Sequence, residues 1–350
     1  MSQSIPPFND RALDVRVQPD LLPLGQRVAG YLEVGSTAAG QSLSIPYAAI
    51  RGERPGPCLW VNGAVHGDEV NGTLAAIEFF RKLDGQEVSG TVIVTPTANV
   101  QAVNERTKTA AVDRLDMDQC FPGREDGLPT ERLAARLFGA MAPGADVVVN
   151  LHTLGTPFDS KPYAVYKVHP DAGVAEQRLL DMIACFAPNM ACRMPVTAAG
   201  GELPGNIAGA LDYQCLAMGK AAFMIELGVG GRQESEHIAA GERGLRRLCS
   251  MLGILPAGEG MAVPKLRRVT RRSHVMSNAG GFFRTAVQPA QVLPRGEPLG
   301  CIHDVFGKEV EVVRFPQDVI VIAIRRDPVV HSGDRISFVA TEWDEVDVRC

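Results

Sequence analysis

Apolar runs of strand length recur through the first three quarters of the chain, and longer amphipathic stretches separate them. The strand-like runs cover residues 59–65, 91–96, 147–152, 163–168 and 221–227. The spacing of one apolar helix face is found over residues 73–83, 130–141, 172–186 and 235–252. Strands that alternate with helices predict an α/β fold, with a mostly parallel or mixed sheet and helices on both faces.

Two details refine this picture. Thr130 stands where a helix cap is preferred, so the second helix is expected to begin there. Near the start of the chain, Val34 and the alternating residues 43–50 predict additional strands at the edge of the sheet.

The texture of the chain changes after Pro256. Gly and Pro residues within 258–264 predict a linker, and short β-like runs then alternate with Gly, Pro and Asp turns as far as Trp343. We expect no helix of useful length there, so the pattern predicts a small all-β domain. The predicted domains are therefore residues 1–262, which carry the α/β sheet, and residues 263–350.

Polar side chains interrupt or end three of the strand-like runs. His66 and Glu69 follow the first run, His152 ends the third, and Glu226 lies in the fifth. Ligands bind at strand ends in open α/β sheets, and two histidines with one glutamate suit a zinc ion that activates water. Each histidine alone is more often a hydrogen-bonded core residue, and Glu226 alone could pair with an arginine. Together they favour a metal site.

Composition limits the classes of partner. The chain has 350 residues, 45% of them apolar and 21% charged, which is typical of a soluble globular protein. A net charge of −5, without a basic cluster that contains aromatic residues, argues against nucleic acid or an anionic membrane as a partner. We expect no export signal and no membrane-spanning segment. Eight cysteines without a CxxC pair predict free thiols in a cytoplasmic protein.

Three segments together resemble one family. The segments Gly63-Ala-Val-His66-Gly-Asp-Glu69, Asn150-Leu-His152-Thr and Ile225-Glu226-Leu-Gly are similar to signature blocks of the succinylglutamate desuccinylase/aspartoacylase family. This family is a branch of the zinc carboxypeptidase-like hydrolases and cleaves the amide of N-acyl amino acids and related small molecules. The resemblance extends from about residue 43 to about residue 256.

The resemblance implies a role for each polar residue. His66, Glu69 and His152 would hold one zinc ion per chain, and Glu226 would be the general base. Arg106 stands where the family places an arginine that stabilises the oxyanion, although it could also be a solvated loop residue. The expected activity is that of a zinc-dependent amidohydrolase or deacylase. A metallocarboxypeptidase and a non-catalytic small-molecule-binding protein on the same fold are the alternatives.

One block departs from the family pattern. Relatives carry Asp-(Leu/Met)-Asn-Arg before Phe-Pro-Gly, whereas this chain has Asp116-Met-Asp118-Gln119. In relatives that act on acidic substrates the Asn-Arg pair grips a carboxylate, which Gln119 cannot pair with and Asp118 would repel. We therefore predict a neutral or cationic substrate. Alternatively, one of three other cations takes over the anion: Lys161, Arg193 or Arg232. Asp116 is expected to orient a neighbouring arginine or a ligand histidine.

Loops near the strand ends supply further candidates. Asp159 and Lys161 follow His152 in a loop rich in turn formers, and both are predicted to contact the substrate. The glycine-rich residues 200–206 could cover the site.

The C-terminal region carries a resemblance of its own. Residues 280–300 resemble a lipoyl-like barrel-sandwich domain, without the lysine that a carrier domain would modify. This domain is expected to form a wall of the pocket or an oligomer contact, and the sequence leaves open whether the chain forms a homo-oligomer.

Overall fold

The computed structural model describes residues 18–196, 206–258 and 265–349. The helices within these residues are α1 (Val70–Arg81), α2 (Val100–Glu105), α3 (Pro129–Met141), α4 (Glu176–Ala184), α5 (Leu211–Ala217) and α6 (Ser235–Met251). Short 3₁₀ turns include η2 (Met117–Gln119) and η5 (Ile207–Gly209).

The strands up to residue 258 are β1 (Arg27–Ser36), β2 (Ser42–Arg51), β3 (Arg54–Gly63), β4 (Ser89–Thr95), β5 (Val147–Leu154), β6 (Phe158–Ser160), β7 (Tyr163–Tyr166), β8 (Ala191–Arg193) and β9 (Ala221–Val229). Those after it are β10 (Lys265–Met276), β11 (Gly281–Thr285), β12 (Val292–Leu293), β13 (Pro298–His303), β14 (Glu309–Arg314), β15 (Val319–Arg325), β16 (Val329–Val330) and β17 (Arg335–Asp347).

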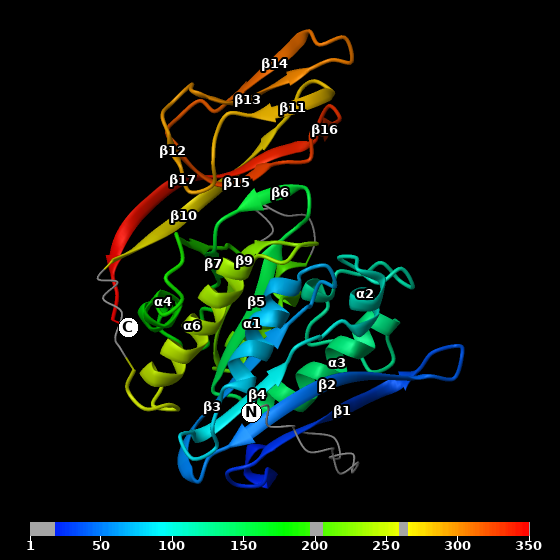
Figure 1. The fold of residues 1–350 in the computed structure, drawn as a ribbon, viewed down its shortest axis with the longest axis vertical. Helices are drawn as coiled ribbons and strands as arrows, with labels where there is room; N and C mark the ends of the chain where they lie inside the picture. Colours follow the sequence, from blue (N-terminus) through cyan, green and yellow to red (C-terminus); the bar gives the residue numbers. More distant parts are fainter. Residues whose placement is uncertain (1–17, 197–205, 259–264, 350) are drawn as a thin grey trace.

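A large mixed sheet forms the centre of the molecule (Figure 1). Its order is β1-β2-β4-β3-β5-β9-β7-β8-β10-β17-β15-β12, and β6 pairs with β15. The four central strands β4, β3, β5 and β9 are parallel, whereas β7 runs antiparallel to β9. The predicted mixed α/β fold is confirmed, and β1 forms the expected edge.

Helices cover both faces of the central strands. Helices α1 and α6 pack closely on one face, where a side chain on Gly72 would meet Leu151 and one on Gly241 would meet Leu227. On the opposite face, the first amide of α5 donates to Asp118, which also accepts from Asn150 of β5. Helices therefore contact both faces of the central strands.

The C-terminal strands continue the central sheet. Strand β10 pairs in parallel with β8, and β10, β17 and β15 then form an antiparallel extension, which lies below β14, β13 and β11 in Figure 1. A second sheet in the order β14-β13-β11-β16 lies beyond it. This region is all β in its described residues, as predicted. Its barrel-sandwich character and the boundary at residue 262 stay predictions.

Some element boundaries differ from the predicted ones. Helix α3 begins at Pro129, and the hydroxyl of Thr130 donates to Asp113 instead of capping the helix. Glu131 accepts from the backbone amide of Leu128 and caps this end. Residues 98–129, which lack periodicity, include the short helix α2 and the turn η2.

Two further observations concern the cysteines and the possibility of a membrane-spanning helix. The seven cysteines within the described residues are free thiols. Among those residues we find no helix that is both long and apolar enough to cross a membrane. A cytoplasmic location stays a prediction.

Candidate active site

The loop after β3 delivers His66 and Glu69 to the sheet edge. Strand β3 ends at Gly63, and Ala64 then takes a left-handed conformation with φ 50°. The carbonyl of Ala64 accepts from the amide of Asn99, which ties this turn to the start of α2. Gly67 lies against the backbone of Ala102 so closely that no side chain would fit. The glycine between the two polar residues is therefore a packing requirement.

His66, Glu69 and His152 converge on one point. One carboxylate oxygen of Glu69 lies 2.7 Å from Nδ1 of His66, and the other lies 2.9 Å from Nδ1 of His152. The three side chains are buried, and one potential ligand atom from each falls within 4.8 Å of the others. His66 and Glu69 share the loop after β3, and the fold brings His152 to them from the distant strand β5.

The electrostatics of this cluster follow from its charges. Burial acts to raise the pKa of Glu69, but the two imidazoles outweigh burial and hold its pKa well below the usual range. Burial acts to lower the pKa of His66, yet the carboxylates of Glu69 and Asp116 hold it well above its ordinary value. This is the behaviour of a compact cluster of opposite charges.

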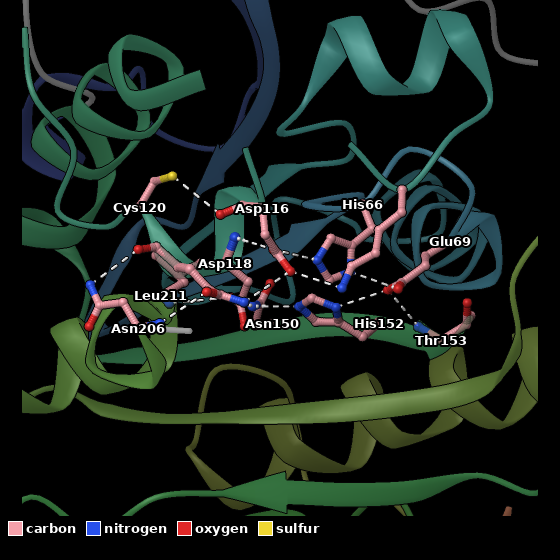
Figure 2. A network of polar contacts seen from close by, with 12 residues as sticks. His66, Glu69, Asp116, Asp118, Cys120, Asn150, His152, Thr153, Asn206 and Leu211 are labelled. Atoms are coloured by element: carbon pink, nitrogen blue, oxygen red, sulfur yellow. Dashed lines mark hydrogen bonds and ion pairs between the residues drawn. The ribbon is translucent and has the colours of Figure 1, made fainter. Parts of the chain in front are cut away.

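Outer contacts fix both imidazole rings (Figure 2). Asp116 Oδ1 lies 2.9 Å from Nε2 of His66. The side-chain nitrogen of Asn150 lies 2.8 Å from Nε2 of His152. The side-chain oxygen of Asn150 accepts a hydrogen bond of 2.9 Å from the side chain of Asn62. Asn62 and Asn150 are fully buried. These partners hold each ring with Nδ1 directed at Glu69, as ligand histidines in metal sites are commonly held.

Glu226 comes from the neighbouring strand. It is the register partner of His152 across β5 and β9, and of Tyr163 across β7 and β9. Its side chain is buried, and Oε2 has no hydrogen-bond partner among the described residues. Burial, with the negative charge of Glu69 as a smaller cause, raises the pKa of Glu226 to about 7. A carboxylate in this condition is suited to proton transfer near neutral pH.

Lys108, and not Arg106, is the cation beside the cluster. Arg106 ends α2 in a left-handed conformation with φ 58°, and its side chain is exposed and absent from the cavity wall. Two residues later, Lys108 lines the cavity and pairs with Asp116 over 2.8 Å. The left-handed turn at Arg106 ends α2 before the chain reaches Lys108. Lys108 lines the cavity and Arg106 does not, and the role of Arg106 at the oxyanion stays a prediction.

Asp118 and Gln119 both line the cavity, and their contact with a substrate stays a prediction. Asp118 accepts long hydrogen bonds from the side chain of Asn150 at 3.4 Å and from the backbone of Leu211 at 3.3 Å. It forms no ion pair with any described residue, and burial raises its pKa. The side chain of Gln119 accepts from the amide of Asn206.

Asp159 and Lys161, the predicted substrate contacts, do not line the cavity. Strand β6 pairs with β15 and turns Phe158 toward the cavity, so its neighbour Asp159 points the other way and pairs with Arg232 and Arg326. Lys161 is exposed beside the start of α6. Of the loop at residues 200–206, all but Asn206 falls outside the described residues.

The cluster opens into a cavity of about 460 Å³. The central sheet and its loops form one wall, and C-terminal strands supply five further residues: Arg272, His274, Ile322, Arg335 and Phe338. A wall of the pocket was one of the two roles expected for the C-terminal region, but the sequence did not indicate these side chains.

Comparison with known proteins supports this architecture. A model of the succinylglutamate desuccinylase/aspartoacylase catalytic domain matches residues 55–252. The chain belongs to this family. It is 29% identical over 311 residues to the N-alpha-acetyl-L-2,4-diaminobutyric acid deacetylase of Halomonas elongata, a match that covers 87% of each protein.

Solved structures of the family share nearly the whole fold. The product-bound ectoine utilization protein EutE (DoeB) from Ruegeria pomeroyi superposes with a TM-score of 0.78 and 25% identity, over 92% of this chain and 98% of that one. A succinylglutamate desuccinylase/aspartoacylase from Rhodobacter sphaeroides superposes with a TM-score of 0.77 and 26% identity, over 92% of this chain and 96% of that one. These matches include the C-terminal β region, which is therefore part of the shared fold.

The donor set of this family member fits a divalent metal. Two imidazole nitrogens and a carboxylate are ligands that zinc accepts in catalytic sites with one open position. Their burial, the outer contacts of both rings and the unpaired oxygen of nearby Glu226 all match such a site. The carboxylate of Glu69 lies between the two rings, where its negative charge would balance part of the charge of a bound cation.

Proposed function

We propose that this chain is a zinc-dependent deacylase that hydrolyses the amide of a small N-acyl diamino acid or a related N-acyl amine. The observation that carries the proposal is the convergence of His66, Glu69 and His152 beside the buried, unpaired carboxylate oxygen of Glu226. The relative from Halomonas elongata, named as a deacetylase of N-acetylated diaminobutyric acid, supports the substrate class.

The chain's own residues account for the proton transfers. A zinc ion held by His66, Glu69 and His152 would polarise the amide carbonyl and activate water. Glu226, with its raised pKa, takes a proton from the attacking water and delivers it to the leaving amine. Lys108 supplies positive charge on the cavity wall where the carbonyl oxygen becomes negative. Asp116 holds both Lys108 and His66 in place.

The acidic side of the cavity favours a cationic leaving group. Asp118 lines the cavity without a cation partner among the described residues, and Gln119, which also lines it, carries no charge. The nearby ammonium of Lys167 is already held by both carboxylate oxygens of Asp212. A substrate ammonium would supply the positive charge that Asp118 lacks.

The test is release of amine from a matched panel by the zinc-loaded protein, with a chelated sample as control. The panel contains N-acetylaspartate, N-succinylglutamate and the acetylated forms of diaminobutyrate, ornithine and lysine. We expect the chelated sample to be inactive and the diamino compounds to have the highest kcat/KM. A preference for the two acidic compounds would show that our interpretation of Asp118 and Gln119 is wrong.

Metal binding has a readout that does not depend on finding the substrate. Zinc that binds only the folded state stabilises it, by about 4 kcal/mol when its concentration is a thousand times Kd. We expect the unfolding temperature to fall on chelation and to recover with one equivalent of Zn²⁺, and we expect His152→Ala to abolish that recovery. An unchanged unfolding temperature together with no bound metal would contradict a zinc site.

A further inference from the structure

The C-terminal strands bring positive charge to the cavity wall. Arg272 of β10 and Arg335 of β17 both line the cavity, and β10 and β17 are antiparallel neighbours. An N-acyl diamino acid carries a carboxylate beside the amide as well as a distant ammonium. A role for these cations in binding that carboxylate rests on the proposed function, because it assumes the same class of substrate.

The Arg335 side chain has no polar partner in the described part of the chain. Its Nε is buried and forms no hydrogen bond. Its guanidinium carbon lies 4.6 Å from the centre of the Phe338 ring, which also lines the cavity. Burial lowers the pKa of Arg335, as expected for a cation removed from water without a counter-charge.

This arrangement is costly unless an anion completes it. A partly buried guanidinium without a hydrogen-bond acceptor loses hydration, and stacking on an aromatic ring recovers only part of that loss. The ring does hold the planar group in one orientation. A guanidinium fixed in this way presents paired donors to a carboxylate.

The neighbouring residues support the cavity-facing position of Arg335. Its backbone carbonyl accepts from Arg325, which also binds the carbonyl of Val329, so the start of β17 is anchored. The second cation, Arg272, acts electrostatically on Glu226 and lowers its pKa as a smaller effect than burial. Positive charge from the C-terminal strands therefore reaches the region of the reacting groups.

The cations suggested by the sequence do not take this position. Lys161 faces a different hollow, Arg193 lies 3.9 Å from Glu176, and Arg232 pairs with Asp159 and Glu234. None of the three lines the cavity.

We propose that Arg335 binds the carboxylate of the substrate through its guanidinium, held flat by Phe338, and so determines specificity for N-acyl amino acids over N-acyl amines. The cavity would then read the two ends of an N-acyl diamino acid separately. The ammonium lies toward Asp118 of the turn η2, and the carboxylate lies toward Arg335 of β17.

The test compares two substrates in two variants of the zinc-loaded protein. The substrates are Nα-acetyl-L-2,4-diaminobutyrate and its carboxamide, which has the same shape without the negative charge. The variants are Arg335→Met and the control Arg271→Met. Arg271 lies on β10 with a side chain that is 72% exposed and pairs with Glu342 outside the cavity.

For Arg335→Met we expect KM for the acid to rise about 10- to 100-fold, the range for a lost hydrogen bond to a charged group. We expect kcat for the acid, and both constants for the carboxamide, to change less than about threefold. Arg335→Lys should recover part of the affinity, because it restores charge without the paired donors. Equal losses for acid and carboxamide would mean that Arg335 only supports the fold, and would overturn the proposal.

A binding measurement separates this inference from the proposed function. N-acetylglycine and N-acetylglycinamide differ in the carboxylate and contain no second amine. Calorimetry with the zinc-loaded protein should show tighter binding of the acid to the wild type, and no such preference in Arg335→Met. If the wild type hydrolyses no diamino compound but still shows this preference, the deacylase proposal fails and the role of Arg335 stands. Equal binding of both probes to the wild type would overturn it.

Discussion

His152 and Glu226 are register partners on the adjacent parallel strands β5 and β9. A proposed metal ligand and the proposed base are therefore positioned by backbone hydrogen bonds of the sheet core and not by a loop. Both side chains are buried, and Glu226 keeps one carboxylate oxygen unpaired. The site thus has a rigid base with its reactive atom available.

Replacing that base separates catalysis from metal binding. For Glu226→Gln we expect kcat to fall about 10²- to 10⁴-fold, the usual contribution of general acid–base catalysis, while zinc content stays at one per chain. The unfolding temperature should not fall, because the replaced oxygen makes no hydrogen bond. Glu236→Gln, at an exposed position early in α6, is the matched control. Substantial turnover by Glu226→Gln would exclude Glu226 as the base.

Lys108 and Arg106 can be distinguished by parallel substitutions. Lys108 lines the cavity beside Asp116, whereas Arg106 does not line it. We expect Lys108→Met to lower kcat about 10²- to 10³-fold, as the loss of an oxyanion donor does, and Arg106→Met to lower it less than about threefold. Steady-state kinetics of both variants on one substrate would decide the matter. The reverse order would restore the role that the sequence assigned to Arg106.

The sequence predicted the central sheet well, because each parallel strand contains a continuous apolar run that is followed by a polar residue. The same pattern identified His66 and Glu226. It failed in residues 98–129, because a segment without periodicity does not show whether Arg106 or Lys108 reaches the cavity. The left-handed conformation of Arg106, which ends α2, leaves no mark in the sequence.

Other site residues depend on long-range pairing. Arg335 reaches the cavity because β10 pairs with β8 and extends the central sheet, a contact between distant segments that alternation alone does not reveal. Asn150 is a different case. It lies two residues before His152 on one strand, so a shared face was predictable from the strand period, although the sequence pattern was interpreted only through its charged residues and histidines.

Asn150 is expected to affect both stability and metal affinity. Its amide lies between Asn62 and the imidazole of His152, and all three side chains are buried. Asn150→Ala leaves buried polar groups without partners, which costs about 1–3 kcal/mol of unfolding free energy. Loss of an orienting partner also weakens zinc binding about 10- to 100-fold.

Urea unfolding and chelator competition measure these two effects. Asn189→Ala is the control, because Asn189 is exposed and donates only to the backbone of Pro162. Zinc affinity that stays at the wild-type value in Asn150→Ala would show that the His152 ring is held without this contact.

Substitution of Gly67 tests whether the close packing of the loop against α2 positions His66 and Glu69. A side chain at this glycine would overlap the backbone of Ala102, so Gly67→Ala must displace the loop or the helix. We expect the unfolding free energy to fall by about 1–3 kcal/mol, the usual cost of overpacking, and zinc affinity to fall with it.

Gly139→Ala is the matched control. It lies in α3 with no atom within 4 Å of the added carbon, and should stabilise the helix by up to about 1 kcal/mol. Chemical denaturation and zinc titration of both variants check these values, and a Gly67→Ala protein that binds zinc as tightly as the wild type would show that this contact does not position the ligands.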